Sequence, residues 1–136
     1  MKNILFLAVS FGFLCMACGK KEAQYIPAES ALDAGREFID ACLKGDFAKA
    51  AFYMVNDSTN TRHLGQAESR YRENDKEGRQ QLRQASINIR EVSDVDDSTS
   101  IIYYNNSFDK LPLKVKIVRQ DKAWLVDFKY TFSPNL

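Results

Sequence analysis

The side chains of this sequence that could carry chemistry are few. Three cysteines, Cys15, Cys18 and Cys42, and one histidine, His63, are the only thiols and the only imidazole in 136 residues. Cys42 follows Phe38 by four positions on one side of an expected helix, where a free thiol usually behaves as a small apolar side chain. A nucleophilic thiol would need a basic partner, and His63 lies in a polar segment with no predictable contact to Cys42. We therefore predict no catalytic residue.

Three acidic residues, Asp94, Asp96 and Asp97, raise the question of a metal ion. Their segment, DVDDSTS, lacks the central glycine and the closing glutamate of an EF-hand calcium loop. His63 has no second histidine, cysteine or carboxylate at the spacing of metal ligands. The sequence therefore predicts no metal and no cofactor, and we expect the acidic residues to form a hairpin loop.

The first 17 residues have the pattern of a secretory signal peptide. Lys2 gives a basic start, and residues 4–17 form an apolar run that is shorter than the roughly 20 residues needed to span a bilayer. Residues 14–19, LCMACG, resemble the cleavage box of bacterial lipoproteins, with Cys18 as the new N-terminus. The resemblance implies that Cys18 carries a diacylglycerol and an acyl chain such as palmitate. The lipid would be the protein's contact with the membrane.

This resemblance also predicts where the protein resides. We expect a lipid-anchored protein of the bacterial cell envelope, and Gly19 after the cysteine resembles lipoproteins that are sent to the outer membrane. The alternative is ordinary cleavage after Ala17, which would leave a soluble secreted protein.

The expected mature chain is a short tether followed by one domain. Residues 18–28 lack periodicity and contain Pro27, so they are predicted to be a spacer, and residues 29–136 form the domain. The whole chain has 19 Lys and Arg against 18 Asp and Glu. This balance gives no basic surface for a nucleic acid, so we expect no nucleic-acid partner.

The first half of the domain has helical patterning. Ser30 with Asp33 approximates a capping box that opens a helix, and Gly45 ends this helix. Asp46 is then expected to cap a second, shorter helix. Residues 61–85 predict a largely solvated helix, interrupted near Gly78. Two pairs on this helix have the favourable i, i+4 spacing: Glu68 with Arg72, and Asp75 with Arg79.

From Ser86 onward the hydrophobic period changes to two, which predicts four antiparallel strands. The turns between them are expected at residues 94–98, 105–112 and 120–122, and the last strand is expected to run to Phe132. The side chains predicted to face inward are Ile87, Ile89, Ile101, Tyr103, Leu113, Val115, Ile117, Trp124, Val126, Phe128, Tyr130 and Phe132. Helices followed by strands indicate an α+β fold, with the helices packed on one face of a curved antiparallel sheet.

Two stretches resemble a known superfamily. Residues 38–50 and 115–127 are similar to the N-terminal helix pair and the last hairpin of small bacterial lipoproteins of unknown function in the nuclear-transport-factor-2-like superfamily, also called cystatin-like or ketosteroid-isomerase-like. The resemblance implies three helices packed into the concavity of a twisted sheet, which together form a cone.

Enzymes of this superfamily use an inward carboxylate as a base and a Tyr or a neutral acid as an oxyanion donor. The side chains predicted to face inward here include no acid, and Asp127 is expected on the opposite face of its strand. We therefore expect that the protein is not an enzyme. If the cone holds a small apolar ligand, the candidate pocket residues are Tyr103, Trp124, Phe128 and Tyr130.

The opposite face of the sheet is predicted to be unusually apolar. Ile102, Tyr104, Val118 and Leu125 are the candidate interface residues on this face, for a homodimer or for another envelope protein. The preferred interpretation is a non-catalytic binding or structural role through this outer sheet face. A small-ligand binder that uses the cone is the alternative, and an isomerase-type or hydrolase-type enzyme is the least favoured class.

Overall fold

The computed structural model describes residues 24–133, which contain four helices followed by four strands and a 3-10 turn. Cys18, the predicted signal peptide and most of the predicted tether lie outside the described residues. The helices are α1 (Ala31–Lys44), α2 (Phe47–Phe52), α3 (Ser58–Glu73) and α4 (Lys76–Gln84). The strands are β1 (Ile87–Asp96), β2 (Thr99–Asn106), β3 (Leu113–Gln120) and β4 (Ala123–Asp127), and η1 (Phe128–Phe132) follows. Within residues 24–133, no helix has the length and apolarity needed to cross a membrane.

The first two helices form as the caps predict. The Ser30 hydroxyl accepts a hydrogen bond from the Asp33 amide, and Gly45 adopts the left-handed conformation (φ 77°) that ends α1. Asp46 accepts a hydrogen bond from the Lys49 amide and caps α2. A β-carbon at position 45 would also lie 2.5 Å from the Tyr71 ring. Gly45 is thus needed both for the turn and for the close approach of α3.

The next helical segment differs from the prediction in its break point. Asn74 and Asp75 are extended, and the Asp75 side chain accepts a hydrogen bond from the Gly78 amide as the N-cap of α4. The interruption therefore comes four residues before Gly78. Glu68 and Arg72 form the expected ion pair at 2.5 Å. Asp75 and Arg79 do not form the expected pair, because Asp75 caps the helix and Arg79 donates to the carbonyl oxygens of Arg72 and Asn74.

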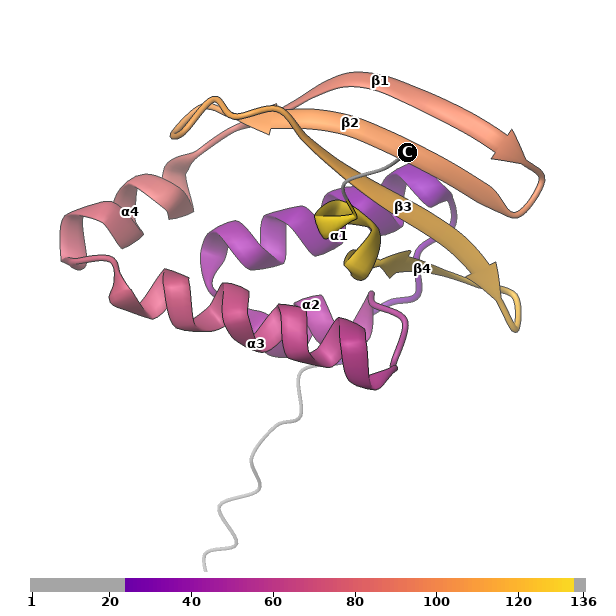
Figure 1. Ribbon diagram of the computed structural model, residues 1–136, viewed down its shortest axis with the longest axis horizontal. Coiled ribbons are helices and arrows are strands. Elements are labelled where there is room, and N and C mark those ends of the chain that lie inside the picture. The colour runs from indigo at the N-terminus through magenta and orange to yellow at the C-terminus, as the bar shows by residue number, and fades with distance from the viewer. Residues whose placement is uncertain (1–23, 134–136) are drawn as a thin grey trace, which may run out of the picture.

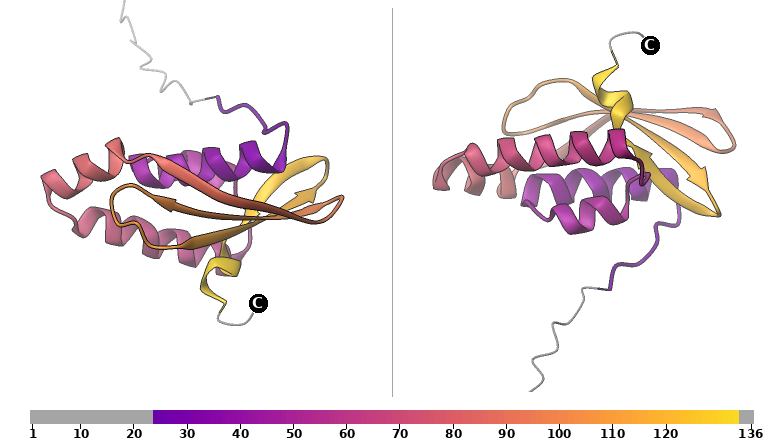
Figure 2. Two further views of the ribbon diagram at one scale, coloured as in Figure 1. Left: turned by 90° about the horizontal axis from the view of Figure 1, so that it is seen from above. Right: turned by 60° about the horizontal axis from the view of Figure 1, so that its bottom comes forward.

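The four strands form one antiparallel sheet in the order β1-β2-β3-β4, and the helices lie on one of its faces (Figure 1). α1 packs against all four strands, and η1 connects the sheet to α3 at its far edge (Figure 2). The α+β prediction is confirmed. The prediction that the last strand runs to Phe132 is wrong, because pairing with β3 ends at Asp127 and the chain then turns into η1.

The core lies between α1 and the sheet. Its fully buried side chains include Phe38 on α1 and Val115, Ile117 and Val126 on β3 and β4. Gly35 lets α1 approach the sheet closely, because a β-carbon there would lie 2.5 Å from the Ile102 side chain.

The predicted phase of β2 is wrong. Ile102 and Tyr104 are buried, with 0% and 7% of their surface exposed, while Tyr103 is 37% exposed on the outer face. Two of the four candidate interface residues are therefore core residues. The sequence SIIYYN repeats each apolar type in neighbouring positions, so alternation alone leaves its phase undefined. Pairing with β3 sets the phase, because Ile102 lies opposite the buried Val115.

Candidate functional site

A cavity of about 240 Å³ lies between the helices and the first part of β3, and we call it the inner pocket. α1 supplies one wall, α3 and α4 supply the mouth, and the sheet with η1 supplies the floor. Most of its lining is apolar, and four polar residues, Arg70, Asn74, Asn106 and Asp109, contribute to it. The remaining lining residues are Phe38, Ile39, Cys42, Leu43, Ala67, Tyr71, Leu82, Tyr104, Leu113 and Phe128.

Tyr104 lines the pocket with a hydroxyl that has no protein partner among the described residues. Its side chain is buried, and no hydrogen bond of residues 24–133 involves its hydroxyl. Burial, with Cys42 and Asp109 nearby, raises the pKa of Tyr104 above its ordinary value. The phenol therefore stays neutral and can donate one hydrogen bond to a molecule in the pocket.

Cys42 also lines the inner pocket, and its environment suppresses its reactivity. Burial alone raises the pKa of the Cys42 thiol to about 12. At neutral pH the side chain is therefore a neutral thiol. This agrees with the sequence-based interpretation of Cys42 as a small apolar side chain.

Two polar residues of the lining, Asn106 and Asp109, form hydrogen bonds within the β2–β3 loop. The Asn106 side chain accepts hydrogen bonds from the amides of Phe108 and Asp109, and the Asp109 carboxylate accepts one from the Leu111 amide. These contacts shape the β2–β3 loop. Asp109 is the only carboxylate among the described residues that line the pocket, and sequence reasoning missed it because it assigned this segment to a turn.

The four predicted pocket residues do not come together. Phe128 lines the inner pocket and packs edge-on against Phe38, with 4.9 Å between ring centroids. Tyr103 faces outward, and the Tyr130 ring lies beneath Lys114 Nζ, 4.7 Å from the ring centroid. Trp124 lines a different cavity. The prediction of one pocket lined by all four is wrong.

The cavity at Trp124 has about 630 Å³ and lies between the start of α1 and the β1–β2 hairpin. Asp94, Asp96 and Asp97 line it, but Asp94 accepts a hydrogen bond from Ser100 and Asp96 accepts two from Ser98. These bonds from Ser98 lower the pKa of Asp96. The acidic residues thus build the hairpin. Residues 24–133 contain no group of three or more His, Cys, Asp or Glu that could hold a metal ion.

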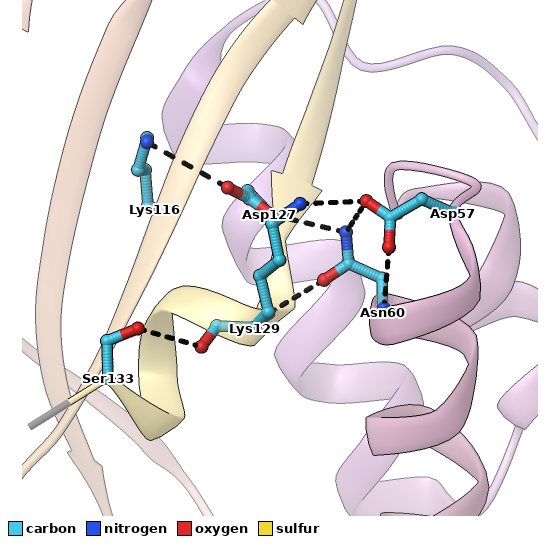
Figure 3. Close-up of polar contacts among 6 residues, drawn as sticks. All are labelled: Asp57, Asn60, Lys116, Asp127, Lys129 and Ser133. Carbon is cyan, nitrogen blue, oxygen red and sulfur yellow. Dashed lines mark hydrogen bonds and ion pairs between the residues drawn. The ribbon is translucent and has the colours of Figure 1, made fainter.

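Asp127 belongs to a polar cluster outside the pocket, made of Asp57, Asn60, Asp127 and Lys129 (Figure 3). Asn60 is fully buried at its centre. Its amide nitrogen donates to Asp57 at 3.0 Å and to Asp127 at 3.1 Å, and its oxygen accepts from the Lys129 amide at 2.7 Å. Lys129 Nζ lies 2.8 Å from Asp57 and 3.0 Å from Asp127. These contacts fasten η1 to the start of α3.

The charges of this cluster are stabilised by their partners. Hydrogen bonds from the Asn60 backbone N–H and from the Lys129 side chain lower the pKa of Asp57. Hydrogen bonds from the Lys129 side chain to Asp57 and Asp127 raise the pKa of Lys129. Because its polar groups bond one another, the cluster holds η1 against the start of α3. Asp127 is not among the residues that line the inner pocket, and it lies opposite Lys116 in the pairing of β3 with β4.

Comparison with known proteins supports the fold. A solved structure, an NTF-2-like protein of unknown function from Shewanella oneidensis MR-1, matches with a TM-score of 0.53 and 10% sequence identity, over 70% of this chain and 89% of that chain. The chain therefore has a nuclear-transport-factor-2-like fold. No protein-family model and no curated protein matches the sequence. At 10% identity the likeness concerns the fold alone.

Proposed function

We propose that this protein is a non-catalytic binding protein, held at a bacterial envelope membrane by lipid on Cys18, and that its inner pocket takes a small, uncharged, largely apolar ligand. The observation that carries this proposal is the Tyr104 side chain, which is 7% exposed, lines a mostly apolar cavity and has a hydroxyl with no hydrogen-bond partner among residues 24–133. A buried polar group usually has a hydrogen-bond partner, so a ligand with one acceptor is the natural occupant.

The size and charge of the pocket limit its ligand. A cavity of about 240 Å³ is smaller than the roughly 300–1,000 Å³ typical of drug-sized ligands. The neutral Cys42 thiol and the neutral Tyr104 phenol line it among mostly apolar side chains, where a charged ligand would lose hydration. The lining also includes one basic and one acidic residue, Arg70 and Asp109, so it carries no excess of either charge. A single ring or a short chain that carries a carbonyl or ether oxygen fits these limits.

The pocket is tested with two probes of similar shape, acetophenone and isopropylbenzene, of which the first has a hydrogen-bond acceptor. We expect Tyr104→Phe to weaken acetophenone binding by about fivefold, because a neutral hydrogen bond contributes about 1 kcal/mol. The same substitution should leave isopropylbenzene binding unchanged. NMR titration measures both affinities in both proteins, and equal changes for the two probes would refute the role of Tyr104.

A blocking variant tests the location. Ala67 lines the pocket on α3, and its neighbour Gln66 is exposed on the same helix. Ala67→Phe should abolish binding of both probes, and Gln66→Phe should preserve it. Binding that survives Ala67→Phe would place the ligand elsewhere.

The anchor is tested separately by the intact mass of the protein purified from its own membranes. The proposal predicts a chain that begins at residue 18 and carries acyl chains. An unacylated chain that begins at the same residue would support ordinary secretion instead.

A second candidate function is protein docking through the outer sheet face. Val118 and Leu125 are half-buried on this face, and Ile101 and Tyr103 lie on the same side of the sheet. Leu125→Glu should lower the sedimentation coefficient of a dimer, whereas identical monomers before and after the change would reject the homodimer.

An enzymatic role is favoured by one observation, the presence of Asp109 and Tyr104 in the same lining. A carboxylate base and a phenol donor are the groups that proton abstraction next to a carbonyl requires. Incubation of acetophenone in deuterated water should show methyl exchange that Asp109→Asn removes, if the pocket is catalytic. The binding proposal predicts no protein-dependent exchange.

A further inference from the structure

Three arginines from α3 and α4 surround a separate cavity of about 440 Å³. Arg72, Arg79 and Arg83 line it together with Gly45, Phe47 and Tyr71, and we call it the arginine pocket. Its lining residues come from the α1–α2 junction and from α3 and α4. The proposed ligand-binding role of the inner pocket does not use it.

Neutral groups hold these guanidinium groups in place. Arg83 donates a hydrogen bond to the Tyr71 hydroxyl at 3.1 Å, and this hydroxyl donates to the Lys44 carbonyl oxygen at 3.3 Å. Arg79 donates to the carbonyl oxygens of Arg72 and Asn74. These contacts orient the guanidinium groups of Arg79 and Arg83. Because the acceptor oxygens are neutral, the contacts do not neutralise the positive charges.

Among the described residues, the charges of Arg79 and Arg83 have no carboxylate partner within 4.0 Å. Arg72 pairs with Glu68. The acidic side chains near the pocket have other roles, because Asp40 pairs with Lys44, Asp46 caps α2 and Asp75 caps α4. Two guanidinium groups therefore share a concave site, and each has free N–H donors that match phosphate geometry.

The described chain begins beside this pocket. The Tyr25 hydroxyl donates to Asp46 at 3.3 Å, and Asp46 stands between the pocket residues Gly45 and Phe47. The Tyr25 ring lies 5.4 Å from the Phe52 ring on α2. Tyr25 lies seven positions after Cys18, and such a segment spans at most about 25 Å. A lipid on Cys18 would therefore keep this side of the domain near the membrane surface.

We propose that the arginine pocket binds the phosphate of an anionic phospholipid in the membrane that holds Cys18, and thereby docks the helical side of the domain on the bilayer. The inference rests on the anchor of the proposed function. Lys20 and Lys21, in the segment between Cys18 and the domain, add positive charge beside the anchor.

The test uses the chain from residue 18 to 136 with Cys18→Ser, which contains every described residue and cannot be acylated. Its binding is measured by flotation with vesicles of phosphatidylcholine alone or with one part in three of phosphatidylglycerol. We expect binding only with phosphatidylglycerol, and weaker binding at high salt. Arg79→Gln with Arg83→Gln should weaken it by about tenfold, since charge-assisted hydrogen bonds are lost.

Arg62→Gln with Arg90→Gln is the matched control, because it removes the same charge from exposed positions elsewhere. The proposal expects this control to bind within about twofold of the parent. Equal losses in the two double variants would overturn the pocket and indicate general charge attraction. Inorganic phosphate that shifts the Arg79 and Arg83 side-chain NMR signals without any vesicle binding would overturn the membrane assignment. An unacylated native protein would refute the anchor, while vesicle binding by this chain would still support the pocket.

Discussion

The inner pocket and the polar cluster around Asn60 differ in how their polar groups are bonded. In the pocket, burial without partners raises the pKa values of Cys42 and Tyr104, so both groups stay neutral. In the cluster, hydrogen bonds and ion pairs lower the pKa of Asp57 and raise that of Lys129, so both groups stay charged. The pocket therefore still has a polar group that can form a hydrogen bond, whereas the polar groups of the cluster already bond one another.

This contrast indicates which of the two is available to another molecule. The cluster joins residues from α3, β4 and η1 and satisfies the fully buried Asn60 side chain within the protein. The pocket has a phenol whose hydroxyl has no hydrogen-bond partner within residues 24–133, so it can bond to water or to a bound molecule. Four variants or reagents can break or sharpen this comparison.

The largest effect is expected at Cys42. Burial raises the pKa of the Cys42 thiol and leaves little thiolate at pH 8, so iodoacetamide should modify it more than about tenfold more slowly than in urea-unfolded protein. The Cys18→Ser mature chain has Cys42 as its only thiol. Mass spectrometry follows the reaction, and a rate within tenfold of the unfolded control would mean that the pocket is hydrated.

Asn60→Leu should produce the largest loss of stability. The substitution leaves the Lys129 amide and two carboxylates without their buried partner, which should cost about 3 kcal/mol. Calorimetry should show a melting temperature lower by roughly 10–20 °C. Asn56→Leu, at an exposed position just before α3, is the control and should change stability by less than about 0.5 kcal/mol. Similar melting temperatures for both variants would remove the cluster's structural role.

Asp57→Asn should change the pH dependence of stability. Because the folded-state pKa of Asp57 is lowered, its contribution is present above its unfolded pKa of about 3.9 and is lost as pH falls through the folded value. The variant should therefore lose less stability than the parent between roughly pH 5 and pH 2. Urea unfolding at several pH values measures this, with Asp97→Asn as the exposed control. Parallel curves for parent and Asp57→Asn would contradict the assignment.

Tyr104→Phe should have the smallest effect on stability. The hydroxyl makes no hydrogen bond within the described chain, so its removal should change the free energy of unfolding by less than about 0.5 kcal/mol. Urea unfolding of the ligand-free protein provides the measurement. A loss of 1 kcal/mol or more would reveal a protein partner for the phenol and would end the comparison with the cluster.

The sequence predicts those features that depend on neighbouring residues. Ser30, Gly45 and Asp46 mark helix ends through their own side chains or backbone, and the structure confirms all three. The inward face of β3 follows from the alternation of Val115 and Ile117 with lysines. The Glu68–Arg72 pair follows from helical spacing alone.

The sequence fails where distant segments decide. The phase of β2 depends on its pairing with β3, and the turn of residues 128–132 away from the sheet depends on contacts with α3. The cluster links Asn60 to Asp127, which lie 67 positions apart, so no local sequence pattern predicts this contact. The wrong phase of β2 explains why the sequence predicts Tyr103, instead of Tyr104, in the pocket. It also explains why the sequence predicts Ile102 and Tyr104 on the outer face.

The most direct test of the inner pocket is native mass spectrometry of the protein purified from its own membranes. We predict a small uncharged molecule bound to the parent protein and to Gln66→Phe, and none bound to Ala67→Phe. A parent protein without a bound molecule, or a bound molecule that persists in Ala67→Phe, would contradict the account.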